Sequence, residues 1–118
     1  GRGMGVNLGF PTANIKPENI HKLLPAYGVY IVYSIIDDVK YYGMANVGVR
    51  PTLTNDTKPT LEVNYLDFNE DLYDRDLTVF FLHYIRKEIK FPNTDMLIER
   101  MYEDEEYTRS YIKEHNDI

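Results

Sequence analysis

The residues from Gly9 to Asn14 read Gly-Phe-Pro-Thr-Ala-Asn and follow a glycine-rich opening. Proline fixes its own φ and pushes the preceding Phe10 toward an extended conformation. If the extended path continues, Thr12 and Asn14 point the same way. Their hydroxyl and amide oxygens suit Mg²⁺, and a flexible glycine loop can offer backbone N–H groups to phosphates. The stretch indicates a metal–nucleotide site, although a glycine-rich turn that leads into a strand explains the same residues.

A second candidate residue is Glu62, which lies in the run Leu-Glu-Val-Asn-Tyr-Leu from 61 to 66. Alternation along a strand puts Leu61, Val63 and Tyr65 on one face, with Glu62 and Asn64 on the other. A lone glutamate at such a position usually faces solvent. The functional alternative is a general base aimed into a cleft. Phosphoryl transfer to an alcohol needs a carboxylate within hydrogen-bond reach of the hydroxyl.

The segment from Arg86 to Phe91 ends the last long apolar run of the chain. It is either a charged strand end over solvent, or a rim where Arg86 holds an anionic or planar ligand and Phe91 stacks on it. The three histidines, at 21, 83 and 115, show no metal-ligand spacing, so we interpret them as structural.

Composition excludes several function classes. The chain has 118 residues, which is one domain, and a net charge of −6. Nucleic-acid binders usually carry a basic patch, so this acidity argues against one. The absence of cysteine excludes disulfides and thiolate zinc sites. No run approaches the roughly 20 apolar residues of a membrane span, and no signal peptide is visible. We therefore expect a cytoplasmic protein with no membrane partner.

The elements that must position the candidate residues begin with strands. The ranges 27–36 and 39–49 are rich in β-branched and aromatic residues and predict a hairpin. Asp37-Asp38 suits its tight turn, because aspartate tolerates positive φ better than most residues. Further strands are predicted over 60–66 and 77–89, with a loop over 67–76 between them.

A helical pattern follows the break at Phe91-Pro92-Asn93. Apolar residues at 97, 98, 101 and 102 mark one helical face, and Asn93, Thr94 or Asp95 is the N-cap. A second helical stretch is predicted from Asp104 to about Glu114, with Asp104 as its cap. Strands followed by a helix favour an antiparallel sheet or small barrel with a C-terminal helix.

Six segments, taken in order, resemble riboflavin kinase, the flavokinase domain that also forms the C-terminal half of bacterial bifunctional FAD synthetases. They are Gly-Phe-Pro-Thr-Ala-Asn at 9–14, Tyr-Gly-Val-Tyr at 27–30, Asn-Val-Gly-Val-Arg-Pro-Thr at 46–52, Leu-Glu-Val-Asn at 61–64, Asp-Phe-Asn-Glu-Asp-Leu-Tyr at 67–73 and Ile-Arg-Lys-Glu-Ile-Lys-Phe at 85–91.

The resemblance implies a mainly β fold, a six-stranded antiparallel Greek-key barrel with a C-terminal helix. It implies transfer of the ATP γ-phosphate to riboflavin, giving FMN, with Mg²⁺ or another divalent cation. Glu62 matches the base that takes the proton of the ribityl 5′-hydroxyl, and Thr12 and Asn14 match the metal ligands. The implied nucleotide- and flavin-binding residues are Gly3, Gly5, Gly9, Pro11, Thr12, Asn14, Asn46, Arg86 and Phe91.

Some features depart from the family pattern. The first barrel strand, which normally precedes the glycine loop, is absent, so residues 1–118 are expected to be an N-terminally truncated riboflavin kinase domain. An FMN adenylyltransferase domain is expected before it in the full-length protein. The usual histidine two residues after the base is Asn64, and a usual glycine is Asp74. Two other functions stay open: a non-catalytic, flavin-binding regulatory module, and a small barrel that binds proteins.

Overall fold

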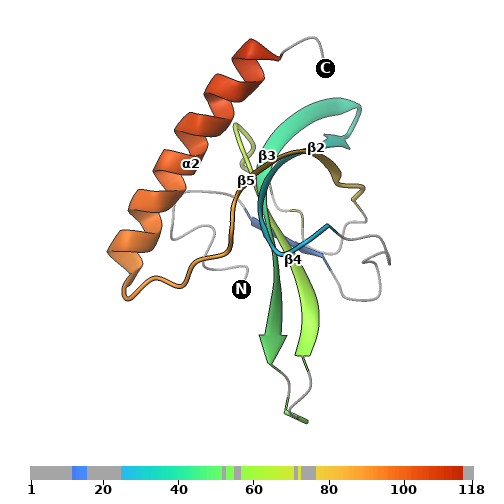
Figure 1. The fold of residues 1–118 in the computed structure, drawn as a ribbon. Coiled ribbons are helices and arrows are strands. Elements are labelled where there is room, and N and C mark those ends of the chain that lie inside the picture. Colours follow the sequence, from blue (N-terminus) through green and yellow to red (C-terminus); the bar gives the residue numbers. More distant parts are fainter. Residues whose placement is uncertain are drawn as a thin grey trace. The chain divides into compact units, whose positions relative to one another are not determined.

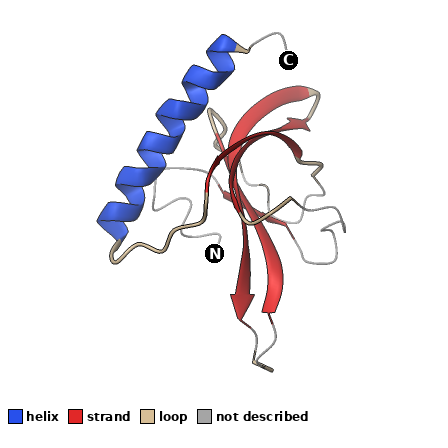
Figure 2. Ribbon diagram, viewed as in Figure 1, coloured by secondary structure: helices blue, strands red, loops and turns tan. Residues whose placement is uncertain are grey.

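A computed structural model describes residues 12–15, 25–51, 53–54, 57–70, 72 and 77–115 of the chain. The chain divides into two compact units, one up to Glu88 and one from Ile89 onward. Figures 1 and 2 show an antiparallel sheet in the first unit and one long helix in the second. The expectations for the glycine loop, for Pro11, for His21 and for Asp74 lie outside the described residues.

Five strands form the sheet: β1 (Thr12–Ile15), β2 (Gly28–Ile36), β3 (Val39–Pro51), β4 (Thr57–Tyr65) and β5 (Phe80–Arg86). Their spatial order is β1-β4-β3-β2-β5, and every neighbouring pair is antiparallel. Consecutive strands β2, β3 and β4 form a meander, and β1 lies beside β4. This is the strand order of a Greek key.

The six-stranded barrel that the family resemblance implies is not what the described residues form. They form a five-stranded sheet in an open order, with β1 and β5 at its two ends. The last strand also differs from the sequence prediction, since it spans seven residues and not the range 77–89. Register shifts interrupt its pairing with β2 at two points. Bulges of this kind bend a strand and shorten its regular pairing.

The β2–β3 turn agrees with the prediction. Asp37 and Asp38 have φ values of 51° and 68°. Two consecutive residues with positive φ match the right-handed twist of the flanking strands, and aspartate is one of the residues that tolerates this conformation. The turn sets the register of the hairpin, which runs without a shift from the pair Ile36–Val39 to the pair Gly28–Val47.

One face of the sheet forms the hydrophobic core of the first unit. The buried cluster comprises Tyr30, Val32, Ile36, Ala45, Val47, Leu61, Val63, Tyr65, Phe68 and Leu72. Along β4 these are the alternate residues Leu61, Val63 and Tyr65, as the sequence pattern predicts. The opposite face of the same strands carries Glu62 and Asn64, which are partly buried.

A hydrogen-bonded group ties the core to the segment that leads into β5. Ser34 Oγ donates to the carbonyl of Thr78 at 2.7 Å and lies 2.6 Å from the Tyr65 hydroxyl. Ser34 uses its single hydroxyl proton in the hydrogen bond to the carbonyl, so the Tyr65 hydroxyl donates to Ser34 Oγ. Ser34 and Tyr65 are fully buried. Burial raises the pKa of the Tyr65 hydroxyl above its ordinary value of 10.0.

The second unit contains helix α2 (Thr94–Glu114), which begins at the N-cap Asn93. The Asn93 side chain accepts a hydrogen bond from the Met96 N–H at 2.9 Å. The prediction of two helical stretches is wrong, because one helix runs through the whole range. The sequence from 94 to 114 contains neither glycine nor proline. Asp104 is therefore not a cap; it is buried within the helix and forms an ion pair with Arg100 at 3.7 Å.

None of the helical residues described forms a segment long and apolar enough to cross a membrane.

Candidate active site

The sheet register brings three of the residues predicted for the site into one line across the strands. Asn14 on β1 pairs with Glu62 on β4, and Glu62 pairs on its other side with Asn46 on β3. The line continues to Val29 on β2 and then to Arg86 on β5. Positions directly opposite each other in an antiparallel pair have Cβ atoms about 5 Å apart. Residues that are far apart in sequence thus become neighbours.

A parallel line of pairs lies two residues away. It joins Thr12 on β1 to Asn64 on β4 and Met44 on β3. Thr12 and Asn14 therefore stand at adjacent alternate positions, next to Asn64 and Glu62. The structure supports the extended backbone that the sequence predicts for 12–15. This register places two oxygen-bearing residue types of the kind that bind Mg²⁺ next to the strand of Glu62.

The Glu62 face of the sheet is not a freely solvated surface. On β2 and β3, residues of this face are buried: Val29 is 7% exposed, Ile31 is fully buried, and Met44 is 3% exposed. Glu62 itself is partly buried. A carboxylate set among buried neighbours differs from the solvent-facing glutamate that was the simpler interpretation of the sequence. This burial argues against the solvent-facing interpretation of Glu62, and its role as a general base stays a prediction.

Asn46 has a buried amide oxygen with an unmet hydrogen-bonding requirement. Its Oδ1 atom is buried and accepts no hydrogen bond in the part of the chain that the structure describes. An unpaired buried acceptor costs about 1–3 kcal/mol, and such atoms are rare in native proteins. This atom lies in the residue directly opposite Glu62, so the unmet requirement is within the candidate site.

Glu88 is a residue of this face that the sequence interpretation did not single out. A Cβ atom added at Gly48 would lie 3.0 Å from Glu88 Cδ and 3.1 Å from Oε1, so the carboxylate rests against the glycine. Gly48 is two residues from Asn46 on β3 and pairs with Thr60 on β4. A glycine inside a strand is a sign of close approach by another group, so Gly48 could have indicated from the sequence that a group packs there, but not that the group is Glu88.

Arg86 and Phe91 fall in different units, and the structure describes each separately. Arg86 stands at the end of β5, where its Nη1 donates to the Lys87 carbonyl at 3.1 Å. Phe91 is partly buried and precedes α2. Their shared role at a flavin rim stays a prediction.

The described histidines form no metal site. His83 lies in β5, and His115 ends α2, where its ring stacks on Tyr111 with centroids 4.1 Å apart. Among the residues that the structure describes, no group of three or more His, Cys, Asp or Glu side chains could hold a metal.

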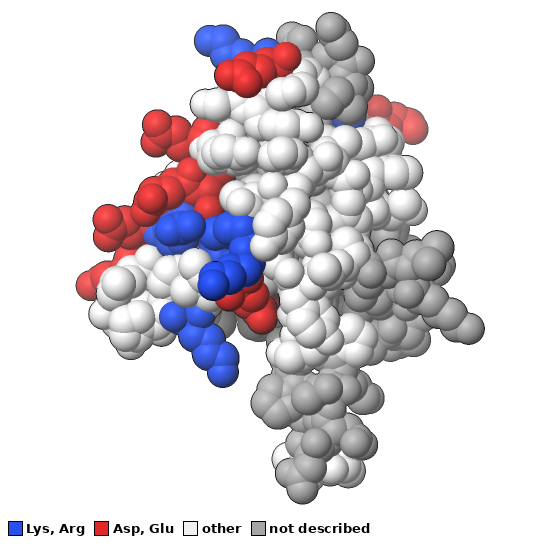
Figure 3. Space-filling model, in the orientation of Figure 1, with Lys and Arg blue, Asp and Glu red and all other residues white. Residues whose placement is uncertain are grey.

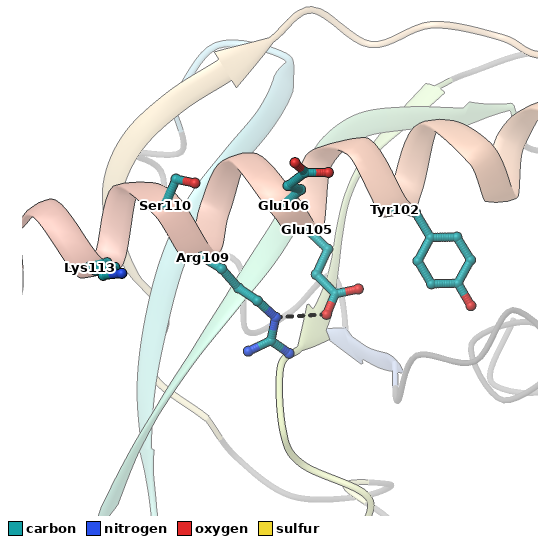
Figure 4. A pocket seen from close by; sticks show the side chains of 6 residues that line it. All are labelled: Tyr102, Glu105, Glu106, Arg109, Ser110 and Lys113. Atoms are coloured by element: carbon teal, nitrogen blue, oxygen red, sulfur yellow. Dashed lines mark hydrogen bonds and ion pairs between the residues drawn. The ribbon is translucent and has the colours of Figure 1, made fainter.

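A hollow along α2 contains none of the predicted site residues. It is lined by Tyr102, Glu105, Glu106, Arg109, Ser110 and Lys113, all from the one helix (Figure 4). Arg109 Nε donates to Glu105 at 2.8 Å. This (i, i+4) pair stabilises the exposed helix by a few tenths of a kcal/mol. The hollow therefore has the character of an open helix surface.

Charged side chains are distributed unevenly over the visible face of the molecule. Figure 3 shows acidic and basic side chains along α2, while most of the visible sheet is uncharged. The acidic residues of the helix include the run Glu103-Asp104-Glu105-Glu106. Helix α2 therefore carries a large share of the acidic residues behind the net charge of −6.

Comparisons with known proteins point to one family. The family model described as "Riboflavin kinase" matches residues 1–112. A bifunctional riboflavin kinase/FMN adenylyltransferase of Pseudomonas fluorescens is 44% identical over 97 residues, which are 82% of this chain and 30% of that protein. The RNA-binding riboflavin kinase RibR of Bacillus subtilis is 35% identical over 104 residues, which are 88% of this chain and 44% of that protein.

A solved structure shares the fold. A Streptococcus pneumoniae protein described as a macrolide-efflux protein superposes with a TM-score of 0.78 and 38% identity, covering 92% of this chain and 35% of that one. The chain thus spans less than half the length of these relatives. The family match over nearly the whole chain, together with the order of the predicted segments, shows that this chain belongs to the riboflavin kinase family.

Proposed function

We propose that this domain transfers the γ-phosphate of ATP to the ribityl 5′-hydroxyl of riboflavin, with Glu62 as the general base. The observation that carries the proposal is the residue line Asn14–Glu62–Asn46 across three strands. It places a glutamate between two asparagines, on a sheet face whose neighbouring residues on β2 and β3 are buried. A base in this role must reach the attacking hydroxyl within about 3 Å.

The residue types present fit a divalent cation. We propose that Thr12 and Asn14 hold it, because hydroxyl and amide oxygens are ligands that Mg²⁺ accepts, and because β1 pairs with the strand of Glu62. When bound, the cation would neutralise charge on the phosphate oxygens. The protein's own residues would orient the acceptor: Glu62 would take the proton from the hydroxyl as its oxygen attacks phosphorus, and ADP would leave.

The other expected ligand-binding residues belong to the same proposal. Gly3, Gly5, Gly9 and Pro11 would contact the phosphates, and Arg86 and Phe91 would contact the flavin. We also propose that a sixth strand completes a barrel with the sheet described above. The protein would act in the cytoplasm and carry an FMN adenylyltransferase domain before this one, as the bifunctional relatives suggest.

The test measures FMN, and any FAD made from it, after incubating the full-length protein with riboflavin and MgATP. We expect product, and we expect Glu62→Gln to lower kcat by about 10²–10⁴-fold, with flavin binding retained. Glutamine keeps the size of the side chain and removes only the base. Absence of product from the wild-type protein would contradict the proposal. Flavin binding without product would indicate the regulatory module.

A further inference from the structure

The residue types along this line change from polar to apolar between β3 and β2. From β1 to β5 it runs Asn14, Glu62, Asn46, Val29 and Arg86. The consecutive polar positions end at Asn46, because the next residue, Val29, is apolar and buried; the charged Arg86 follows it at the far end of the line. Adjacent strands are about 4.8 Å apart, so Asn46 stands one strand from Glu62, on the side away from the proposed cation.

The proposed acceptor has its groups in a matching order. Riboflavin carries its reactive primary hydroxyl at one end of a five-carbon chain, then three secondary hydroxyls, then a fused ring system. If Glu62 contacts the primary hydroxyl, the next polar group along the line faces the secondary hydroxyls. That group is the amide of Asn46.

The state of Asn46 in the structure suits this contact. Its buried Oδ1 has no donor among the described residues, while the side chain as a whole is only partly buried. The torsion about the Cβ–Cγ bond of asparagine has a broad energy profile, so the amide can turn its oxygen or its nitrogen toward a ligand. A hydroxyl both donates and accepts, and it can therefore pair with either atom.

The surroundings of Asn46 supply further acceptor oxygens. Glu62 is the cross-strand partner of Asn46, and the Glu88 carboxylate rests on Gly48, two residues along β3. A group rich in acceptor oxygens favours a ligand rich in donors, and a polyhydroxyl chain is such a ligand.

We propose that Asn46 hydrogen-bonds a secondary hydroxyl of the ribityl chain and so makes this site selective for a polyol. The contact fixes the chain one strand away from Glu62, which limits the positions that the primary hydroxyl can take. This inference rests on the proposed kinase function and adds to it a specificity residue for the acceptor.

The experiment compares riboflavin with its 2′-, 3′- and 4′-deoxy analogues in the full-length wild-type protein and in Asn46→Leu. Leucine has the same branched side-chain skeleton as asparagine, with two methyl groups in place of the amide oxygen and nitrogen. For riboflavin we expect Asn46→Leu to lower kcat/KM about tenfold, the size of one hydrogen bond. For one of the three analogues, wild type and variant should have nearly equal kcat/KM, because the lost hydroxyl and the lost amide are the same contact.

The matched control is Asn64→Leu, the same substitution on the same face of the sheet. Asn64 lies on β4 and pairs with Met44 on β3. Its effect, whatever its size, should be the same for riboflavin and for all three analogues. An Asn46→Leu effect of equal size for all four acceptors would overturn the proposal. Such a result would fit a cation bound at Asn46, because the loss of a metal ligand would not depend on the analogue.

A second measurement does not depend on the variant folding. Wild-type protein should use one deoxy analogue about tenfold less efficiently than riboflavin, and equal kcat/KM for all four would also overturn the proposal. Failure of the proposed function looks different: the wild-type protein would then phosphorylate none of the four acceptors.

Discussion

Removing the Ser34 hydroxyl should destabilise the first unit more than its small size suggests. Ser34 and Tyr65 are fully buried, and Ser34 Oγ bonds both the Tyr65 hydroxyl and the Thr78 carbonyl, at 2.6 and 2.7 Å. In Ser34→Ala the tyrosine hydroxyl keeps its buried position and loses its acceptor. An unsatisfied buried group costs about 1–3 kcal/mol, while the carbonyl belongs to the exposed Thr78 and can bond water.

The variant Tyr65→Phe should cost less. Because Tyr65 is the donor, its removal leaves Ser34 with its own donated bond to Thr78 intact and only an acceptor site unused. We therefore expect about 1 kcal/mol for Tyr65→Phe and about 2–3 kcal/mol for Ser34→Ala. The double variant removes the donor and the acceptor together. It should unfold with a free-energy loss of about 1–2 kcal/mol, which is less than Ser34→Ala alone.

The assay is urea unfolding followed by far-UV circular dichroism, with Ser110→Ala as the control. Ser110 is an exposed residue of α2, so the same substitution there should change the unfolding free energy by less than about 0.5 kcal/mol. In a thermal scan, Ser34→Ala should lower Tm by roughly 10 °C for a domain of this size. Strict additivity of the two single variants would show that the two hydroxyls are not coupled. A larger loss in Tyr65→Phe than in Ser34→Ala would refute the assigned direction of the hydrogen bond.

Three further results should follow from the geometry. Gly43→Ala should destabilise by about 1–3 kcal/mol in urea unfolding, because its Cβ would lie 2.8 Å from the Asn64 carbonyl oxygen. Gly48→Ala should cost clearly less, because the group that its Cβ would meet is the end of the Glu88 side chain. Equal losses in the two variants would contradict this. The burial that raises the pKa of Tyr65 means that the unfolded chain loses this proton first, so stability should fall as pH rises above about 10. The fall should be shallower in Tyr65→Phe, and identical slopes would show that other tyrosines cause it. Asn93→Ala should lower the stability of α2 by about 1 kcal/mol, measured by helical circular dichroism during thermal melting. Asn93→Asp should retain the cap, because its carboxylate can accept the same hydrogen bond. An equal loss of stability in the two variants would argue against capping by Asn93.

Local patterns in the sequence predicted most of the individual elements. The alternation of Leu61, Val63 and Tyr65 identified the core face of β4, and Asp37-Asp38 identified the hairpin turn, because both depend on residues near one another in the chain. The helix was predicted with a break that the structure does not contain. Ion pairs four residues apart, Arg100 with Asp104 and Glu105 with Arg109, span the acidic run where that break was expected.

The arrangement of the site depends on contacts that a local pattern cannot specify. The alternation along β4 already set Glu62 apart from the core, but nothing near residue 62 in sequence indicates that Asn14 and Asn46 flank it. That follows from the strand order, in which β4 lies between β1 and β3. Only the family resemblance joined these residues before the fold was known.

Gly48 shows how a residue without a side chain can make room for a charged group from another part of the chain. Any Cβ there would meet the Glu88 carboxylate, so Gly48 lets a residue beyond the end of β5 lie against β3. The contact brings a second carboxylate within two residues of Asn46, on the strand next to that of Glu62. Gly48→Ala therefore separates two roles: if Glu88 only fills space, stability and activity should change together, and if it contacts the acceptor, kcat/KM for riboflavin should fall while the unfolding free energy changes little.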